Sequence, residues 1–144
     1  MIDSTATRAQ EAQPSPGRLR QTRQGAAVDA ALAQADGFRS AQELYALLRA
    51  AGDGIGLTTV YRHLQLLADT GVVDVVHNRD GEATFRLCGS SPHHHHLVCR
   101  DCGRSVEVSG PEVEAWADAV ARQSGYTAVS HTVEVFGLCP EHSV

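Results

Sequence analysis

Histidine and cysteine residues are concentrated in one stretch of the chain, Ser90 to Cys102, with the sequence SSPHHHHLVCRDC. Four consecutive histidines lead, after two apolar residues, into a C-x-x-C pair formed by Cys99 and Cys102. Neutral imidazole is the commonest metal ligand in proteins, thiolate is a strong zinc ligand, and this cysteine spacing is that of a zinc knuckle. The stretch therefore predicts a metal-binding protein.

The histidine run can serve two different sites if it forms a β-strand. Successive side chains of a strand point to opposite faces, so His94 and His96 would lie on one face and His93 and His95 on the other. A single short strand then supplies two pairs of imidazoles to two separate metal sites.

Two simpler explanations account for this stretch less well. A remnant of a histidine tag would lie at a terminus, whereas this run is internal and is followed directly by Leu97 and Val98. A redox-active C-x-x-C pair belongs to a βαβ context, which the neighbouring sequence does not show. Metal ligation remains the leading interpretation.

The size of the chain also favours a metal as a structural element. A chain of 144 residues forms one compact domain or two small ones, and small domains commonly need a metal or disulfide for stability. No run approaches the roughly 18 apolar residues of a membrane span, and the N-terminus lacks the apolar stretch of a signal peptide. We therefore expect a cytoplasmic protein, whose four cysteines are metal ligands rather than disulfides.

The net charge of −5 argues against a generally basic nucleic-acid binder, but the charge is unevenly distributed. Up to Arg86 there are nine arginines against ten acidic residues, and from His93 onward three against seven. All cationic side chains are arginines, which bind phosphate and guanine well. DNA binding by the first half therefore remains open.

The first half has the pattern of three helices followed by a hairpin. After a polar segment, residues 1–17, which we expect to be a flexible arm, Thr22 caps a helix that runs to about Ala35. Ser40 and Glu43 form a capping box for the second helix, and Thr58 or Thr59 begins the third, which Gly71 ends. Two alternating strands, joined at residues 78–81, complete the order of a winged helix over residues 18–87.

The third helix of a winged helix enters the major groove, so its outward residues are the candidate DNA contacts. Arg62 can bind guanine, Tyr61 a thymine methyl group or a phosphate, and Thr58 and Thr59 a phosphate at the helix N-terminus. Arg20 and Arg23 are further candidates for phosphate contacts. A generic helical bundle shows the same periodicity and is the alternative fold, and Tyr61 could instead pack partly against the hairpin. We expect His63 only to face solvent or to lie near the DNA backbone.

The second half predicts a small α/β domain, so the whole chain is of the α+β class. Residues 88–92 resemble a hinge, and residues 93–144 contain two strands, a helix that begins at Pro111 and ends before Gly125, and a last strand from Tyr126 to Cys139. An exposed apolar strand edge in so small a unit favours pairing with a second copy, and we expect a homodimer.

The motif TTVYRHLQLL, the hairpin, H-x-H, C-x-x-C, a further histidine and a terminal Cys-x-x-His together resemble the Fur family of metal-responsive transcriptional regulators, in particular its zinc-sensing branch. The resemblance covers Arg20 to His142. It implies a repressor that binds an inverted repeat in double-stranded DNA and controls zinc-uptake genes. It also implies about three zinc ions per chain, each with four protein ligands.

The resemblance implies three ligand groups. The structural zinc group is Cys99, Cys102, Cys139 and His142, where the last position departs from the four-cysteine pattern of the family and could instead be a solvated tail histidine. The dimer-domain group is His93, His95, Glu114 and His131, with Glu112 and Glu107 as rivals for Glu114. The hinge group is Asp74, Cys88, His94 and His96.

Three alternatives to a zinc-responsive repressor remain. A related sensor of iron, manganese, nickel or peroxide would use the same scaffold, although the thiolate of Cys88 favours zinc. A zinc hydrolase needs an open metal position and a general base, whereas these groups are full and H-E-x-x-H is absent, so we expect no enzyme. A zinc buffer or chaperone would have no use for Tyr61 and Arg62.

Overall fold

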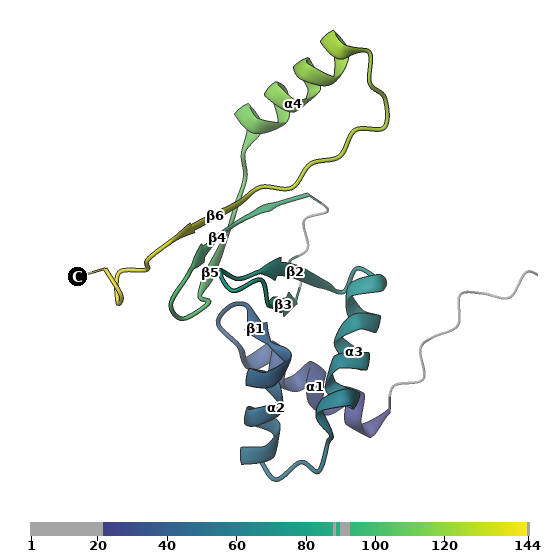
Figure 1. Ribbon diagram of the computed structural model, residues 1–144, viewed down its shortest axis with the longest axis vertical. Coiled ribbons are helices and arrows are strands. Elements are labelled where there is room, and N and C mark those ends of the chain that lie inside the picture. The colour runs from purple at the N-terminus through teal and green to yellow at the C-terminus, as the bar shows by residue number, and fades with distance from the viewer. Residues whose placement is uncertain (1–21, 88, 90–92, 144) are drawn as a thin grey trace, which may run out of the picture.

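The computed structural model describes residues 22–87, 89 and 93–143 (Figure 1). The predicted arm at residues 1–17, the candidate DNA contact Arg20 and the candidate ligand Cys88 lie outside the described residues, as does most of the predicted hinge.

The first half folds as the predicted winged helix, which we call the head (residues 22–87). Its helices are α1 (Arg23–Gln34), α2 (Ala41–Ala50) and α3 (Leu57–Asp69), and its sheet contains β1 (Arg39–Ser40), β2 (Val73–His77) and β3 (Ala83–Leu87) in the order β1-β3-β2. Thr22 caps α1, and the capping box of Ser40 and Glu43 begins α2, as predicted. The helix α3 begins at Leu57, one residue before the predicted start, and has no side-chain cap.

Apolar residues at helical spacing hold the three helices together. Val28, Leu44, Val60 and Leu64 are completely buried in one core between α1, α2 and α3. Because these positions recur at intervals of three and four residues on each helix, the opposite face of α3 is left to solvent. The core therefore presents the outward side of α3 as a fixed surface.

The second half, which we call the metal domain (residues 93–143), contains β4 (His95–Cys99), β5 (Ser105–Val108), α4 (Pro111–Ser124) and β6 (Glu134–Gly137). Its sheet has the order β5-β4-β6, with β5 antiparallel and β6 parallel to β4. Pro111 begins α4, and Gly125 ends it in a left-handed conformation, as predicted. Figure 1 shows α4 standing clear of the sheet.

The predicted last strand is wrong in length. We expected extended structure from Tyr126 to Cys139, but only Glu134–Gly137 pairs with β4. Ala128 has a positive φ of 54°, which interrupts the extended backbone, and the residues before β6 instead return the chain from the end of α4 to the sheet. A parallel neighbour of β4 requires such a crossover.

The head and the metal domain meet at the turn of the C-x-x-C pair, a contact that the sequence did not indicate. The backbone N–H of Phe38 donates to the carbonyl oxygen of Gly103 at 2.9 Å, and the Nη1 of Arg39 donates to the carbonyl oxygen of Cys102 at 2.7 Å. The small buried cluster at this contact consists of Phe38, Val76 and Val98.

The backbones approach so closely here that only glycine fits. A Cβ atom at Gly37 would collide with the carbonyl oxygen of Gly103, and Gly103 itself adopts a φ of +73°. The turn that carries the C-x-x-C pair is therefore shaped by its contact with the head.

As far as the structure describes the chain, none of its helices combines the length and the apolar character needed to cross a membrane.

Candidate metal centres and nucleic-acid interface

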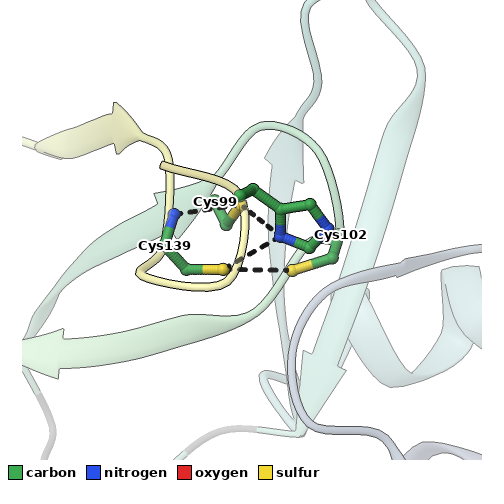
Figure 2. A group of neighbouring side chains, drawn as sticks. Cys99, Cys102 and Cys139 are labelled. Atoms are coloured by element: carbon green, nitrogen blue, oxygen red, sulfur yellow. Dashed lines mark hydrogen bonds between the residues drawn. The ribbon is translucent and has the colours of Figure 1, made fainter. Parts of the chain in front are cut away.

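The C-x-x-C turn and the end of the chain form the first candidate metal centre, the knuckle group. Cys99 and Cys102 come from β4 and the turn after it, and Cys139 and His142 come from the turn after β6 (Figure 2). The Sγ atoms of Cys102 and Cys139 are 3.8 Å apart, and the Nδ1 of His142 lies 3.1 Å from the Sγ of Cys139 and 4.0 Å from that of Cys99. Sulfur ligands of tetrahedral zinc lie about 3.8 Å apart, so these four residues fit the ion.

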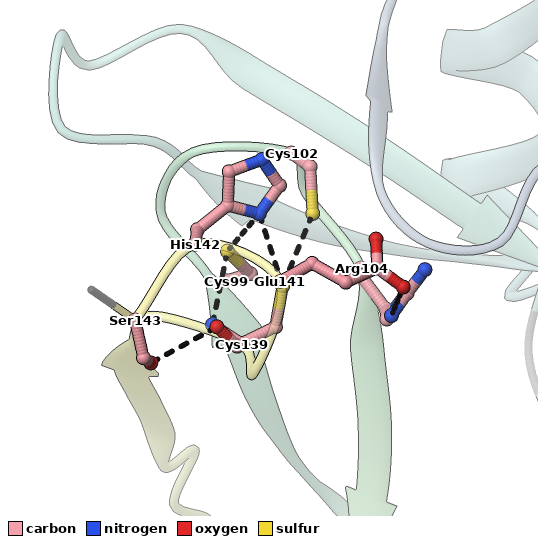
Figure 3. A network of polar contacts seen from close by, with 7 residues as sticks. All are labelled: Cys99, Cys102, Arg104, Cys139, Glu141, His142 and Ser143. Carbon is pink, nitrogen blue, oxygen red and sulfur yellow. Dashed lines mark hydrogen bonds and ion pairs between the residues drawn. The ribbon is translucent and has the colours of Figure 1, made fainter.

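His142 points into this group rather than into solvent, as Figure 3 shows. The chain end is held by Ser143, whose Oγ donates to the carbonyl oxygens of Leu138 at 3.0 Å and of Cys139 at 2.9 Å. An ion pair of 2.9 Å between Arg104 and Glu141 spans the same turns. The alternative of a solvated tail histidine is therefore not what the structure shows.

The knuckle group favours thiolate at Cys99 and Cys139 but not at Cys102. A backbone hydrogen bond at Arg104 lowers the pKa of Cys102, but burial and the contacts with Cys99 and Cys139 raise it overall. Hydrogen bonds from the backbone at Cys102 and at Cys139 lower the pKa of Cys99 to about 6. The hydrogen bond with His142 lowers the pKa of Cys139 and raises the pKa of His142, because it stabilises the thiolate and the protonated imidazole together. Since zinc binds thiolates, the group is suited to releasing protons on metal binding.

One face of the histidine run forms the second candidate centre, the dimer-domain group, with Glu114 of α4 and His131 of the crossover. The Nε2 atoms of His93 and His95 lie 3.0 Å and 2.7 Å from Oε1 of Glu114, and that of His131 lies 3.0 Å from Oε2. Four donor groups thus converge on one point, as a metal ion of four ligands requires.

Glu114 is the carboxylate of this group, and its two rivals lie elsewhere. Glu112 is exposed in the first turn of α4, and Glu107 is the strand partner of His96, whose side chain belongs to the opposite face of the sheet. Burial alone would raise the pKa of Glu114, but hydrogen bonds from His95, His131 and His93 together lower it. The carboxylate therefore stays ionised for a cation.

The other face of the run forms the third candidate centre, the hinge group, with Asp74 of β2. The Nε2 atoms of His94 and His96 lie 2.7 Å and 3.0 Å from Oδ2 of Asp74. The Nε2 of His96 is buried and, although it lies 3.0 Å from Oδ2 of Asp74, it forms no hydrogen bond with any described residue. A buried imidazole nitrogen without a hydrogen-bond partner is expected of a metal ligand and is unusual for a side chain with a purely structural role.

Burial is the largest influence on His96 and lowers its pKa, although Asp74 opposes this. Neutral imidazole is the form that binds metal. Asp74 comes from the head and both histidines from the metal domain, so this group joins the two parts of the chain. The structure does not describe Cys88, the fourth predicted member.

The lowered pKa of His96 predicts an acid-sensitive fold in the metal-free protein. Below its usual pKa of 6.5 the histidine takes up protons more readily in the unfolded state than in the folded state, so stability falls as the pH drops below about 6.5. The measurement is the thermal unfolding of chelator-treated protein between about pH 7.5 and 5.5. His96→Gln should show a flatter dependence, and equal slopes for both proteins would contradict the assignment.

The outward side of α3 carries the candidate DNA contacts. Tyr61, Arg62 and Thr58 are exposed there, and Thr59 is partly exposed in the first turn, where no side chain caps the helix. Arg23 is exposed at the start of α1. The free N–H groups of an uncapped helix N-terminus can hold a phosphate.

His63 does not face solvent as we expected. It is half-buried, and its Nε2 lies 2.7 Å from Oδ1 of Asp29 on α1. A Cβ atom at Gly25 would lie 2.7 Å from the ring, so α1 and α3 are closely packed at this point. The pair fixes α3 against α1. His63 and Asp29 each lie beside the apolar stripe of their helix, and this position was the only feature of the sequence that could have indicated a contact between them.

A second ion pair that sequence reasoning missed lies beside the hinge group. The Nη1 of Arg86 on β3 lies 3.1 Å from Oε1 of Glu107 on β5, and the backbone N–H of Gly89 donates to the same oxygen at 3.1 Å. The pair joins the head to the metal domain, as the hinge group does.

A winged-helix head with an exposed α3 surface, joined to a domain that gathers three groups of metal-ligand residues, defines a metal-dependent DNA-binding regulator. The sequence model of the Ferric uptake regulator family matches residues 17–136, and the chain belongs to that family. It is therefore a transcriptional regulator rather than an enzyme, and the resemblance that the motifs indicated is confirmed.

Individual relatives include zinc regulators. The chain is 54% identical over 127 residues to the zinc uptake regulation protein of Mycobacterium tuberculosis (strain ATCC 25618 / H37Rv), covering 88% of this chain and 97% of that one. The crystal structure of FurB from M. tuberculosis, a zinc uptake regulator, matches with 52% identity and a TM-score of 0.51 over 88% of this chain and 97% of that one. A zinc uptake regulator complexed with zinc and DNA matches with 30% identity and a TM-score of 0.66 over 85% and 82%.

Proposed function

We propose that this protein is a zinc-responsive repressor of zinc-uptake genes, which binds an inverted repeat in DNA as a homodimer in the cytoplasm. The observation that carries the proposal is the hinge group, because its residues come from both the head and the metal domain. The high identity to a zinc uptake regulation protein and the fold shared with a zinc uptake regulator bound to zinc and DNA support it.

The knuckle group has the thiolate-rich composition of a structural zinc site. We assign it the role of holding β4, the C-x-x-C turn and the chain end together. The dimer-domain group and the hinge group, built from imidazole and carboxylate, are assigned to regulatory metal. With Cys88 in the hinge group, each of the three has four ligands and the chain binds about three zinc ions.

The hinge group provides the mechanism of response. A bound ion would supply a positive charge that draws the Asp74 carboxylate and both imidazoles to one point. Asp74 moves with the head, and His94 and His96 move with the metal domain, so their convergence favours one orientation of the two parts. A coupling free energy of about 3 kcal/mol would change operator affinity about a hundredfold.

Dimerisation is supported by the apolar surface of the metal domain. Leu97, Val106 and Val135 are strand partners in β4, β5 and β6, and each is 43–56% exposed. Of the residues of α4, all of which the structure describes, none is buried, and Trp116 is 67% exposed. A continuous apolar face of this kind is typical of an interface, and a second copy would place two heads on the half-sites of an inverted repeat.

The experiment that tests the proposal is a zinc titration of metal-stripped protein, with a count of bound ions and selection from a pool of random duplexes at fixed salt. We expect about three ions per chain, an inverted repeat among the selected sequences and selection only with zinc. Selection that requires iron or manganese, with only the structural ion as zinc, would overturn the zinc assignment and leave the family scaffold intact.

Arg62→Ala should weaken binding to the selected operator by about 1–3 kcal/mol and relax the preference at one base pair, because a guanidinium in the major groove reads guanine. Gln65→Ala is the matched control, since Gln65 is exposed on α3 one turn further along and its amide donates to Asp69 at 2.8 Å. The operator affinity of both variants is measured from binding curves at several salt concentrations. Equal effects would contradict base reading by Arg62.

A further inference from the structure

The ion pair of Arg86 and Glu107 is built on the same two strand pairings as the hinge group. Arg86 is the strand partner of Asp74, and Glu107 is the strand partner of His96. The side chains of antiparallel partners share a face, with Cβ atoms about 5 Å apart. Two parallel links therefore join the head to the metal domain, namely Asp74 to His96 and Arg86 to Glu107.

Glu107 is thus a carboxylate next to a proposed metal site. Its side chain lies on the same face of the sheet as that of His96, because the two residues are antiparallel strand partners. A free carboxylate at this position would be within reach of an ion held by His96. Oxygen ligands and coordination numbers above four suit manganese and iron, whereas four ligands in a tetrahedron suit zinc.

The structure holds this carboxylate with two donors. The guanidinium of Arg86 and the backbone N–H of Gly89 both donate to Oε1 of Glu107 at 3.1 Å. A Cβ atom at Gly89 would collide with the carboxylate, so the backbone of Gly89 lies directly against it. The side chains of Arg86 and Glu107 are only 25% and 30% exposed, which limits the competition from water.

We infer that Arg86 determines the metal preference of the hinge group by keeping the Glu107 carboxylate out of its ligand set. This inference rests on the proposed function, in which the hinge group is the regulatory metal site. Arg86 acts through Glu107 and is a positioning residue, not a ligand. Arg86 thereby limits the hinge group to its four proposed ligands. A site with four ligands favours zinc over metals that prefer a higher coordination number.

Two variants distinguish this role from simple cross-linking of the two parts. Arg86→Gln and Glu107→Gln both remove the ion pair, but only Arg86→Gln leaves a carboxylate free to reach the ion. We expect the ratio of zinc affinity to manganese affinity at the hinge to fall about tenfold to a hundredfold in Arg86→Gln. In Glu107→Gln, and in the double variant, the ratio should stay near that of the unmodified protein.

The coordination of cobalt(II) provides a readout independent of DNA binding. Cobalt is added to metal-stripped protein, and the absorption of the hinge ion is isolated by subtracting the spectrum of His96→Ala. Tetrahedral cobalt absorbs visible light strongly and five- or six-coordinate cobalt weakly. We expect a strong hinge band in the unmodified protein and in Glu107→Gln, and a weak band in Arg86→Gln.

The outcomes separate the two hypotheses. If both single variants show the same spectrum and the same affinity ratio, Arg86 only links the two parts and the inference is overturned. If the unmodified protein and His96→Ala bind the same number of ions, the hinge group is no metal site and the proposed function fails as well.

Discussion

Replacement of Cys139 by serine is expected to remove the knuckle ion and to destabilise the metal domain severely. Cys139 contacts the Sγ of Cys102 and the ring of His142, and its backbone N–H donates to the Sγ of Cys99 at 3.4 Å. All four ligand residues are therefore linked through this one position. Structural zinc contributes on the order of 10 kcal/mol to the folding of small sites, and a serine hydroxyl is a poor replacement for thiolate.

The measurements are the zinc content of purified protein and thermal unfolding followed by circular dichroism. We expect a loss of about one ion per chain and a decrease of the melting temperature of on the order of 10 °C or more. Glu141→Gln is the matched control in the same turn, because it removes only the exposed ion pair with Arg104. Such pairs contribute about 1 kcal/mol or less. Similar behaviour of the two variants would argue against a structural ion.

Replacement of Cys139 by serine should also weaken the contact between the metal domain and the head. Phe38 and Arg39 hydrogen-bond to the carbonyl oxygens of Gly103 and Cys102, within the turn that the knuckle group stabilises. Disorder of that turn would release a link between the head and the metal domain. This consequence does not follow from the sequence, in which Phe38 and Gly103 are ordinary loop residues.

The division of the histidine run into two pairs was predictable because it depends on local geometry, whereas the partners of each pair came from the resemblance to the Fur family and stay proposed ligands. Strand alternation alone separates His93 and His95 from His94 and His96, and the structure shows each pair with a different carboxylate. The choice among Glu107, Glu112 and Glu114 required the register of β5 on β4, which places Glu107 opposite His96. No periodicity in the sequence fixes that register.

The helices of the head were equally predictable, since capping residues and apolar spacing act within one helix. The contacts between elements were not. The pair of His63 and Asp29 depends on how α1 packs against α3, and the two-residue strand β1 forms only because β3 lies beside it. The last strand was predicted too long because alternation continues through residues 126–132, where the part of the chain that the structure describes offers no neighbouring strand.

Asp74→Ala is expected to abolish most of the zinc dependence of DNA binding while leaving the structural ion in place. Asp74 is the described residue of the head in the hinge group, and without its carboxylate the imidazoles of His94 and His96 lose their contact with β2. If the hinge couples zinc to DNA by about 3 kcal/mol, the roughly hundredfold gain in operator affinity on adding zinc should nearly disappear.

Asp53→Ala is the control for the lost charge, because Asp53 is an exposed acid of the head that lies between α2 and α3 and belongs to none of the three ligand groups. It should keep the full response to zinc. The affinity of each variant for the selected operator is measured with chelator and with excess zinc. An unchanged ratio in Asp74→Ala would show that zinc acts through another group.

Thermodynamic linkage gives a second, independent check of the same substitution. If zinc tightens operator binding by a given factor, operator DNA must tighten zinc binding at the hinge by the same factor. Zinc titrations with and without operator should therefore differ in the unmodified protein and coincide in Asp74→Ala. His96 must be neutral to bind metal, and burial lowers its pKa from the usual 6.5, so zinc and operator binding should weaken together only as the pH falls clearly below 6.5 in the unmodified protein. In Asp74→Ala, acid should change operator affinity no more than it does in the metal-free protein, since the step that couples proton release to DNA binding has been removed.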